Sequence, residues 1–579
     1  MFDIILWVVR LNKKIIIVVC ILLIIFILTM IIALNKSKSS QCIIFNNKMA
    51  IMEEQINENS EYKKLVQNNN NPGVILSVSD ETTRAIVKYA QKSNVEKSLD
   101  QAKKDIEKYL QKNDYEPNWI KVDFINNVQK VDLEEWQETI KNLTIDNILK
   151  NGIKFKYKGH DIVLTDGEIS ANNILNADYS INLENLNNYL KKQNRIQVKK
   201  LPEDLYVFDA ISFFCDEKNN VYDLCNVWID TGRRNIDLNK NQVEEIINTS
   251  RAYLFNMEKE DGKFIYGYNA QSNSEIEKYN ILRHSGSVWS LILTYNEEDG
   301  EIRKKKIDLG IEYLKNNLII KEGKAYALDT TENTVKLGGN ALATIAICEY
   351  IDKFGNNDEY LKIAKQLGNG IIQMQKEEGQ FVHVLNPNNL EVISKYRTVY
   401  YDGEATFALA KLYGITKDKK YLEAAEKAMD YFIENNYLTY KDHWLSYAAN
   451  EITKYSPKEK YFEFGLKNVG ENKQQLLDTN STSHTDFELL MQCYKLYERM
   501  EKEGININYS KLTKQDLEKY IKERAYVQLN TYLYPEKAMY LSNPSKYVNT
   551  FCIIKSNYRI RIDDIQHSIT GYYYYLKTQ

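Results

Sequence analysis

The stretch LFNMEKEDGKFIYGYN, residues 254–269, is similar to a second stretch, IIQMQKEEGQFVHVLN, residues 371–386, at an offset of 117 residues. Within the two stretches this offset pairs Gly262 with Gly379. After them it also pairs Tyr279 with Tyr396 and Gly286 with Gly403. An offset that holds without a gap over about forty residues indicates an internal repeat.

A second similarity shows that the repeating unit is smaller than 117 residues. Residues 336–367, KLGGNALATIAICEYIDKFGNNDEYLKIAKQL, resemble residues 400–429, YYDGEATFALAKLYGITKDKKYLEAAEKAM, and this alignment pairs Gly339 with Gly403. Each of these segments contains an apolar helical stretch, a turn and an amphipathic helical stretch. The repeat is therefore a helical hairpin, and the longer offset spans two hairpins.

Six helical stretches that follow turns have apolar or small side chains on nearly every face of the helix: 284–295, 338–350, 402–413, 443–452, 484–497 and 567–576. Between them lie amphipathic stretches, such as 303–317, 358–375, 419–436 and 514–529. Helices that are apolar all round belong in the interior, and amphipathic helices belong on the outside. The sequence therefore predicts an (α/α)6 toroid over residues 240–579, with six inner and six outer helices.

Upstream of the toroid the pattern is mixed. Residues 74–235 combine one helical stretch, SLDQAKKDIEKYLQ, with strand-like stretches such as NWIKVDFIN and LYVFDAISFF, which predicts a smaller α+β domain of unknown role. The polar segment 35–73 ends in an asparagine run followed by Pro72 and Gly73, and is expected to form a stalk or a short helix plus linker. The fold class is thus mainly α, with the toroid preceded by an α+β domain.

The N-terminus contains a continuous apolar run, IIIVVCILLIIFILTMIIAL, at residues 15–34. A helix of about twenty apolar residues crosses a hydrocarbon layer of roughly 30 Å, so one transmembrane anchor is predicted. Basic residues precede it, and the positive-inside rule leaves residues 1–14 in the cytoplasm and everything after 35 outside. The predicted location is the cell membrane, single-pass, with extracytoplasmic domains.

Composition excludes some classes of function. The net charge of -3, without a basic domain, argues against a nucleic-acid partner. Seven cysteines do not imply a disulfide framework, although Cys215 and Cys225 could close one hairpin. Cys348 and Cys493 lie inside helical stretches, away from any predicted site, so no metal and no cofactor are expected.

The candidate functional residues lie where the inner helices begin. The links that lead into these helices are long, and functional residues concentrate where a rigid scaffold presents its long loops. The predicted catalytic acids are Asp402, Glu404, Asp486 and Asp564. The predicted substrate-binding residues are Arg283, His284, Lys336, Tyr400, Tyr401, His443, Trp444, His484, Arg561 and His567.

Any single acid in this set could instead cap its own helix. Asp402 and Glu404 stand out because their repeat counterparts are Ser285 and Ser287, and a requirement of the scaffold would be expected in both copies. Aromatic rings that stack on sugars, together with carboxylates and imidazoles that bind hydroxyl groups, predict a carbohydrate-active enzyme. A glycoside hydrolase acting on a cell-envelope or capsular polysaccharide, possibly an anionic one, is the first expectation.

Two other classes remain open. One is a glycan-binding or assembly protein in surface-polymer export, with envelope-assembly proteins as partners. It would use the same residues at the starts of the inner helices to bind a glycan, without catalysing a reaction. A sugar epimerase or polysaccharide lyase would use a histidine or tyrosine as its base. A hydrolase requires two carboxyl groups facing each other at roughly 5 to 10 Å, which separates the three hypotheses.

The segments LRHSG, KLGGNALA, YYDGEATFALAKLY and RIDDIQH, with the DGKF and EGQF turns, resemble the six-hairpin toroids of glycoside hydrolases, unsaturated glucuronyl hydrolases, sugar 2-epimerases and the C-terminal domain of glucuronyl C5-epimerases. The resemblance covers about residues 240–579 and concerns the architecture. It implies a toroid that acts on carbohydrate, and it carries no catalytic assignment residue by residue.

Overall fold

The protein is described by a computed structural model that covers residues 40–68, 72–143, 149–226, 230–477, 481–507 and 509–579. The chain forms two compact units. The N-terminal unit comprises the described parts of Met1–Thr139, Lys150–Asn235 and Pro535–Lys546, and the C-terminal unit comprises those of Ile140–Leu149, Ile236–Tyr534 and Tyr547–Gln579.

The predicted transmembrane segment, residues 15–34, lies outside the described residues. Within the described residues, no helix combines the length and the apolar character needed to cross a membrane.

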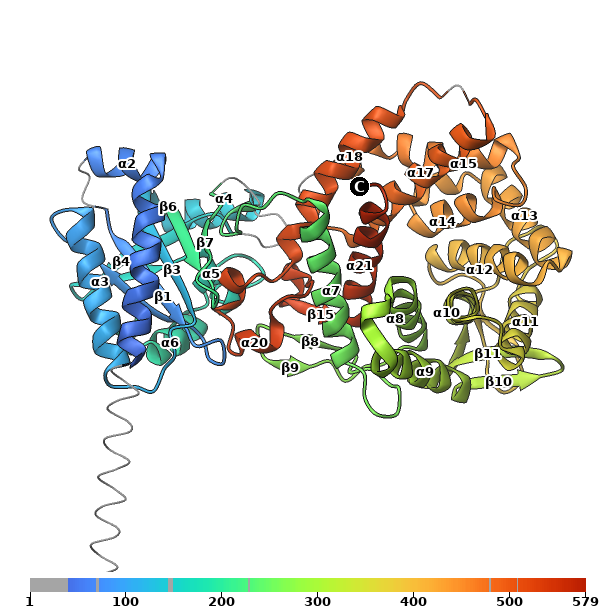
Figure 1. The fold of residues 1–579 in the computed structure, drawn as a ribbon, viewed down its shortest axis with the longest axis horizontal. Helices are drawn as coiled ribbons and strands as arrows, with labels where there is room; N and C mark the ends of the chain where they lie inside the picture. The colour runs from blue at the N-terminus through green and yellow to red at the C-terminus, as the bar shows by residue number, and fades with distance from the viewer. Residues whose placement is uncertain (1–39, 69–71, 144–148, 227–229, 478–480, 508) are drawn as a thin grey trace, which may run out of the picture. The chain divides into compact units, whose positions relative to one another are not determined.

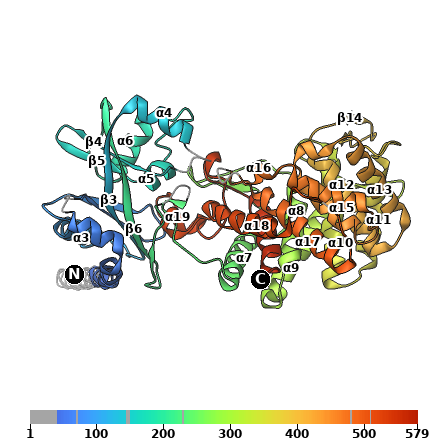
Figure 2. The same cartoon turned by 90° about the horizontal axis from the view of Figure 1, so that it is seen from above.

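The N-terminal unit is built on one antiparallel sheet, in the order β2-β1-β3-β6-β4-β5, with β7 paired to β6. Strands β3, β4, β5 and β6 of this sheet are labelled in Figure 2. Its long central strands β3 and β6 run side by side from the pair Ile120–Cys215 to the pair Asp132–Asp204. The strands are β1 Val74–Ser79, β2 Ile86–Ala90, β3 Trp119–Asp132, β4 Gly152–Tyr157, β5 His160–Leu164, β6 Asp204–Cys215 and β7 Val221–Asp223. The helices are α3 Val95–Leu110, α4 Leu133–Leu143, α5 Asp166–Ala171 and α6 Leu183–Lys192. The predicted α+β character is confirmed for this unit.

The segment 35–73, expected to be a stalk or a short helix plus linker, is helical over most of its described residues. Residues 40–58 are helical, and α2, Ser60–Gln67, follows directly. Phe45, Met49, Met52 and Ile56 are all buried in the same hydrophobic core as strand β1. Their spacing places them on one face of a helix, so the segment packs on the sheet because it has an apolar face.

A segment far along the chain completes the N-terminal unit. It contains the short helices α19 Pro535–Ala538 and α20 Pro544–Tyr547. The backbone N–H of Ala85 donates to the Met539 carbonyl over 2.8 Å, and the hydroxyls of Ser77 and Tyr540 lie 3.1 Å apart. The predicted domain boundaries, 74–235, therefore miss both ends of this unit. Cys215 and Cys225 form no disulfide.

The C-terminal unit contains a closed ring of six inner helices (Figure 1). Each inner helix packs on the next one along the chain, and the last, α21, packs on the first, α8. The inner helices are α8 Ile281–Thr294, α10 Leu337–Phe354, α12 Tyr400–Thr416, α14 His443–Ile452, α17 His484–Glu503 and α21 Ile562–Leu576. These are the six stretches predicted to be interior, so the toroid is confirmed.

Outer helices alternate with the inner ones along the chain. They are α7 Lys240–Asn256, α9 Gly300–Asn316, α11 Asp358–Gln373, α13 Lys419–Glu434, α15 Glu459–Gly470 and α18 Lys514–Gln528, and a short α16, Lys473–Leu476, follows α15. Helix α7 packs on α21 and so completes the outer layer. Because every inner helix is separated from the next by one outer helix, all six inner helices run in the same direction.

All strands of this unit lie in links that lead from an outer to an inner helix. One sheet has the order β10-β11-β12-β13-β14, and a smaller one has the order β15-β8-β9. The strands are β8 Gly267–Asn269, β9 Ser274–Glu275, β10 Leu318–Lys321, β11 Lys324–Asp329, β12 Thr334–Lys336, β13 Val384–Leu385, β14 Val392–Ser394 and β15 Arg559–Arg561. The long links therefore collect at the end of the ring where the inner helices begin.

The two repeated turns have the same structure. Gly262 and Gly379 both have positive φ, at 79° and 108°. A β-carbon on Gly262 would lie 2.1 Å from the Leu309 carbonyl oxygen of α9, and one on Gly379 would lie 2.5 Å from the Lys427 carbonyl oxygen of α13. Glycine is needed in both copies because the turn has a left-handed conformation and touches the backbone of the next outer helix.

Candidate functional site

Contacts between side chains join the first two turns of inner helices into one mouth. Arg283 of α8 bonds Asp563 of α21, with 2.7 Å from Nε to Oδ2. His567 of α21 contacts Glu488 of α17. An aromatic contact joins α12 and α14, and a carboxyl oxygen of α12 lies against the first turn of α10. The predicted convergence of the inner-helix N-termini is therefore present in the structure.

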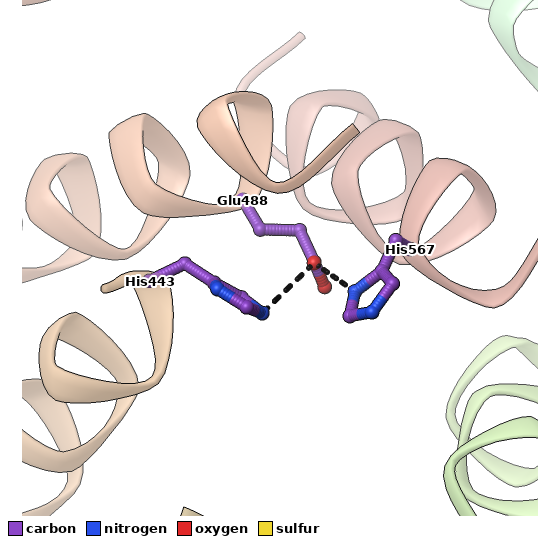
Figure 3. A group of neighbouring side chains, drawn as sticks. All are labelled: His443, Glu488 and His567. Carbon is purple, nitrogen blue, oxygen red and sulfur yellow. Dashed lines mark hydrogen bonds and ion pairs between the residues drawn. The ribbon is translucent and has the colours of Figure 1, made fainter. Parts of the chain in front are cut away.

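His443, Glu488 and His567 meet at the centre of this mouth (Figure 3). Nδ1 of His567 lies 2.6 Å from Oε2 of Glu488, and Nε2 of His443 lies 3.8 Å from the same oxygen. The other Glu488 oxygen accepts a hydrogen bond from the Tyr447 hydroxyl over 2.8 Å. Each of the three comes from a different inner helix, so only the assembled ring creates the group.

The two imidazoles have opposite preferences for a proton. Burial lowers the pKa of His443 to about 3, and the charge of Glu488 offsets this only in part. Burial also opposes the charged form of His567, but the charge and hydrogen bond of Glu488, with Asp563 and Asp564, outweigh it and raise the pKa of His567 above its usual value. At neutral pH, His443 is a neutral base and His567 is biased towards the imidazolium, an arrangement typical of an acid and base pair.

A cluster of arginines and acids lies next to this group. Asp563 accepts from Nε of Arg283 and, over 2.7 Å, from Nη2 of Arg561. Burial would raise the pKa of Asp563, but the two guanidiniums hold it well below its usual range. Arg283 also donates to the Tyr266 hydroxyl over 2.7 Å, and its side chain is 31% exposed. The cluster therefore contains one more positive charge than negative.

Burial favours the neutral form of two acids of the mouth. Burial raises the pKa of Glu404 well above its usual value, and Asp442 adds to this effect while Arg283 opposes it. Oε2 of Glu404 makes no hydrogen bond within the part of the chain that is described. Asp442 accepts from the Trp444 backbone N–H over 3.0 Å, yet burial raises its pKa to about 8. Asp442 is therefore mainly a carboxylic acid at neutral pH, and burial shifts Glu404 in the same direction.

Asp402 is paired on the side away from Glu404. Its Oδ2 accepts from Nε2 of His383 over 3.2 Å. Nδ1 of His383 accepts from the Arg397 backbone N–H over 2.9 Å, so the proton must lie on Nε2. Burial nevertheless raises the pKa of Asp402, with His383 opposing the effect.

Asp564 is occupied by structural contacts. Both of its oxygens accept from the Arg559 guanidinium, over 3.0 and 2.8 Å, and one also accepts from the Arg561 backbone N–H in a capping box. This is the capping role that any of the acids could have had. Asp486 is different, since its Oδ2 is buried and unbonded among the described residues and lies 4.0 Å from Arg524.

Three predicted binding residues are buried and make contacts within the protein. Nε2 of His284 lies 2.9 Å from the Gly310 carbonyl of α9, and Nδ1 lies 2.8 Å from the Tyr279 hydroxyl, so both ring nitrogens have partners. Lys336 is buried against Asp329 over 2.6 Å. Tyr401 is almost fully buried.

The other predicted binding residues differ in accessibility. His484 is buried, with Nδ1 2.8 Å from the Asp564 carbonyl and Nε2 unbonded within the described residues. Trp444 is buried among aromatic rings, including Trp289 and Phe407. Tyr400 is 46% exposed, and its ring centre lies 5.9 Å from that of His443. Tyr400 is therefore the predicted aromatic residue best placed to meet a ligand.

Glu488 was not among the residues predicted from the sequence. It is the only acid within the apolar run FELLMQC, one helical turn after His484. A charged residue inside an interior helix needs a buried partner, and this signal could have identified it.

The same three side chains are also the one group of histidine, cysteine and acid residues, within the described part of the chain, whose ligand atoms come within 4.8 Å of one another. Two imidazoles and a carboxylate can bind zinc. However, the 2.6 Å contact between His567 and Glu488 is a charge-assisted hydrogen bond, and an ion would have to displace its proton. The three side chains are of the types that bind a metal, but His567 and Glu488 already bond each other.

No protein-family model matches the sequence, and no curated protein is similar to it in sequence. Solved structures with similar folds include a D-mannose isomerase, with 14% identity, 59% of this chain and 98% of the other covered, and a TM-score of 0.45. A cellobiose 2-epimerase from Bacillus thermoamylovorans has 12% identity and a TM-score of 0.46, with 59% of this chain and 100% of the other covered. A family 76 glycoside hydrolase from a bovine Bacteroides thetaiotaomicron strain has 11% identity and a TM-score of 0.43, with 80% of this chain and 96% of the other covered.

The C-terminal unit is a six-hairpin (α/α)6 toroid. This assignment rests on the closed ring of inner helices in the chain itself. The (α/α)6 toroid expected from the sequence is confirmed for this region by that ring.

Proposed function

We propose that the toroid is a carbohydrate-active enzyme that transfers a proton at a sugar carbon next to a carbonyl or carboxylate group, as a sugar isomerase or epimerase does. The observation that supports this most directly is the pair of imidazoles, His443 and His567, on either side of Glu488 with opposite protonation preferences. Such chemistry needs one group that removes a proton and one that delivers a proton.

Each residue of the group has a defined role in this proposal. Neutral His443 accepts the proton from carbon through Nε2, which has no hydrogen-bond partner within the described residues. The electron pair left on carbon delocalises onto the adjacent oxygen and forms an enediolate. His567 then delivers a proton to carbon or to oxygen, and Glu488 holds His567 in orientation and in its charged form.

The charges around the mouth favour this reaction over hydrolysis. Glu488 balances His567, and Asp564 balances Arg559, whereas Asp563 faces both Arg283 and Arg561. Burial raises the pKa of both Glu404 and Asp442 and so reduces their negative charge, while the two guanidiniums exceed the charge of Asp563. A positive surround stabilises an enediolate or a uronate carboxylate, but it opposes the oxocarbenium-like transition state of glycoside hydrolysis.

Arg283 is the residue best placed to bind the oxygen that becomes negative. Its Nε and Nη1 are used by Asp563 and Tyr266, and the partly exposed guanidinium retains further donors for a ligand. Tyr400 offers an exposed ring face beside His443 for stacking on a sugar. Lys336, His284 and Asp564 have structural roles in this proposal.

Hydrolysis, the first expectation from the sequence, remains the second candidate. It is favoured by Glu404, because burial raises the pKa of this carboxyl group as a general acid requires. The second group would be Asp486, whose Oδ2 is unbonded among the described residues. Burial raises the pKa of Asp486 as well, with Arg524 opposing this, so Asp486 is a poor carboxylate base at neutral pH.

We also propose that residues 15–34 anchor the protein in the cell membrane, with both units outside the cytoplasm. The uncharged apolar run in the sequence supports this. The substrate would then be a saccharide of the cell envelope, and a uronate-containing chain would suit both the positive mouth and proton transfer at C5. Protease added to intact cells should degrade both units if this orientation is correct.

The test of the function is proton exchange with solvent. The full-length protein in detergent is incubated in D2O with mannose, with cellobiose and with glucuronate-containing oligosaccharides, and NMR follows the signals of the hydrogens at C2 and C5. Loss of one of these signals, with a new isomer of equal chain length, is expected. His443→Gln and His567→Gln should abolish the exchange, and His160→Gln in the N-terminal unit should not affect it.

The other outcomes separate the alternatives. Shorter chains without deuterium at carbon would establish a hydrolase and reject proton transfer. Saturable binding with neither exchange nor cleavage would leave a glycan-binding protein.

A further inference from the structure

A second cavity, of about 350 Å³, lies in the toroid towards the C-terminal ends of the inner helices. All six inner helices contribute to it, through residues such as Leu293, Glu349, Phe407, Tyr447, Lys495 and Tyr574. Leu293, Lys495 and Tyr574 lie two or more helical turns after the mouth residues of their helices, whereas Tyr447 lies one turn after His443 and donates to Glu488. The cavity therefore adjoins the group formed by His443, Glu488 and His567 through Tyr447.

Eight charged side chains line this cavity, among them the acids Asp352 and Glu498, and four of the eight form ion pairs with one another. Lys411 bonds Glu349 over 2.8 Å, and Lys454 bonds Glu451 over 2.5 Å. Glu349 and Glu451 also accept hydrogen bonds from Trp289 and Tyr455. These two carboxylates are therefore fully satisfied by the protein.

Lys495 is not in either of these pairs. Its Nζ has no hydrogen-bond or ion-pair partner within the described residues and lies over the Tyr574 ring, 4.1 Å from the ring centre. Burial lowers the pKa of Lys495 to about 7, the positive charges of Lys454, Lys411 and Arg499 add to the effect, and the negative charge of Glu451 opposes it. The cavity thus has an amine that would gain a proton if a negative charge were placed beside it.

A second donor lies one turn earlier on the same helix. Gln492 is 1% exposed, and its side-chain oxygen accepts from Asn450 over 2.8 Å. Its Nε2 approaches the Tyr447 hydroxyl but makes no hydrogen bond of normal geometry. Gln492 and Lys495 lie two to three turns before the end of α17 at Glu503, where the negative end of the helix dipole has little effect.

We propose that this cavity binds a small organic carboxylate, with its negative group at Lys495 Nζ and Gln492 Nε2 and its apolar part against Phe407, Tyr447 and Tyr574. The volume and the aromatic walls suit a ligand of roughly ten non-hydrogen atoms. A partly buried cation and a buried amide donor, neither of them bonded to a carboxylate within the described residues, favour an anion at this end of the cavity. The inference does not depend on the reaction proposed for the mouth.

The test uses benzoate as the probe, titrated by calorimetry into the full-length protein in detergent. Benzamide and benzylamine serve as controls of the same shape that are neutral and cationic. Benzoate alone should bind, at one site, and should take up a proton near pH 7 because Lys495 becomes charged. Its affinity should fall about tenfold for each pH unit above the pKa of the free lysine.

Three variants locate the site. Lys495→Met, of similar shape, should weaken benzoate binding at least tenfold, and Lys495→Arg should retain binding and remove its pH dependence. Lys502→Met, on an exposed part of the same helix, should bind as the wild type does. Equal binding of benzamide, or full benzoate affinity in Lys495→Met, would overturn the proposal; if that variant fails to fold, absence of proton uptake by the wild type would do so.

Discussion

Replacing Asp442 by asparagine should stabilise the protein, and the gain should increase with pH. Asp442 is fully buried, and its pKa is raised to about 8, from a usual value near 4, by burial. Between these two values the unfolded chain has an ionised carboxylate and the folded chain a protonated one. Folding must then take up a proton, and this costs about 1.4 kcal/mol for each pH unit.

The magnitude follows from this difference. At pH 5 the wild type loses about 1.5 kcal/mol to this proton uptake, and at pH 8 it loses about 5 kcal/mol. Asp442→Asn removes the titrating group and keeps a side chain that caps a helix well, so the bond to the Trp444 N–H is retained. The variant should therefore gain about 3 to 4 kcal/mol over the wild type between pH 5 and pH 8.

Urea unfolding of the full-length protein at pH 5, 6, 7 and 8, followed by near-ultraviolet circular dichroism, measures this difference. Asp563→Asn is the matched control, because the pKa of Asp563 is held below its usual range by Arg561 and Arg283 and this variant should lose stability. A pH-independent difference between Asp442→Asn and the wild type, or a less stable variant at pH 8, would refute the reasoning.

Four further outcomes are expected. Glu488→Gln should move the alkaline limb of the activity profile to lower pH, because Glu488 is the main group that raises the pKa of His567, and initial rates from pH 5 to 9 measure it. Tyr447→Phe should cost about 1 kcal/mol in urea unfolding, because it removes the hydrogen bond to Glu488. Gly379→Ala should lower the melting temperature, since its β-carbon would lie 2.5 Å from the Lys427 carbonyl oxygen, whereas Gly323→Ala on an open turn should have a smaller effect. Dialysis against EDTA should leave activity unchanged, because Glu488 and His567 are bonded directly; recovery only with added zinc would contradict this.

The ring of inner helices could be predicted from the sequence for a physical reason. A helix that is surrounded by other helices must be apolar or small on every side, and this composition differs visibly from that of an amphipathic outer helix. The glycine turns, which recur at a fixed offset in the sequence, revealed the length of the repeat. The length of the helical segment at 40–58 was missed because its apolar residues are separated by many asparagines and acids, although Phe45, Met49, Met52 and Ile56 recur at helical spacing.

The sequence predicted where the site lies but not which side chains act together. His284 and His443 both lie in the first turn of an inner helix, yet His284 contacts the Gly310 carbonyl of its outer neighbour and His443 faces Glu488. Asp564 was a plausible acid until its oxygens were found to be taken by Arg559. Such outcomes depend on side-chain direction and on partners distant in sequence, and a one-dimensional pattern contains neither.

The different protonation of the two histidines can be traced to the groups beside them. Burial disfavours the imidazolium form of both rings. Nε2 of His443 lies 3.8 Å from Glu488, whose charge offsets burial only in part, and the charge of His567 lowers the pKa of His443 further. His567 is bonded to Glu488 over 2.6 Å and has Asp563 and Asp564 on its own helix, and these three acids outweigh the effect of burial. The imidazole that is bonded directly to Glu488 is therefore the one that favours the proton, and the imidazole that lies farther away is left as the base.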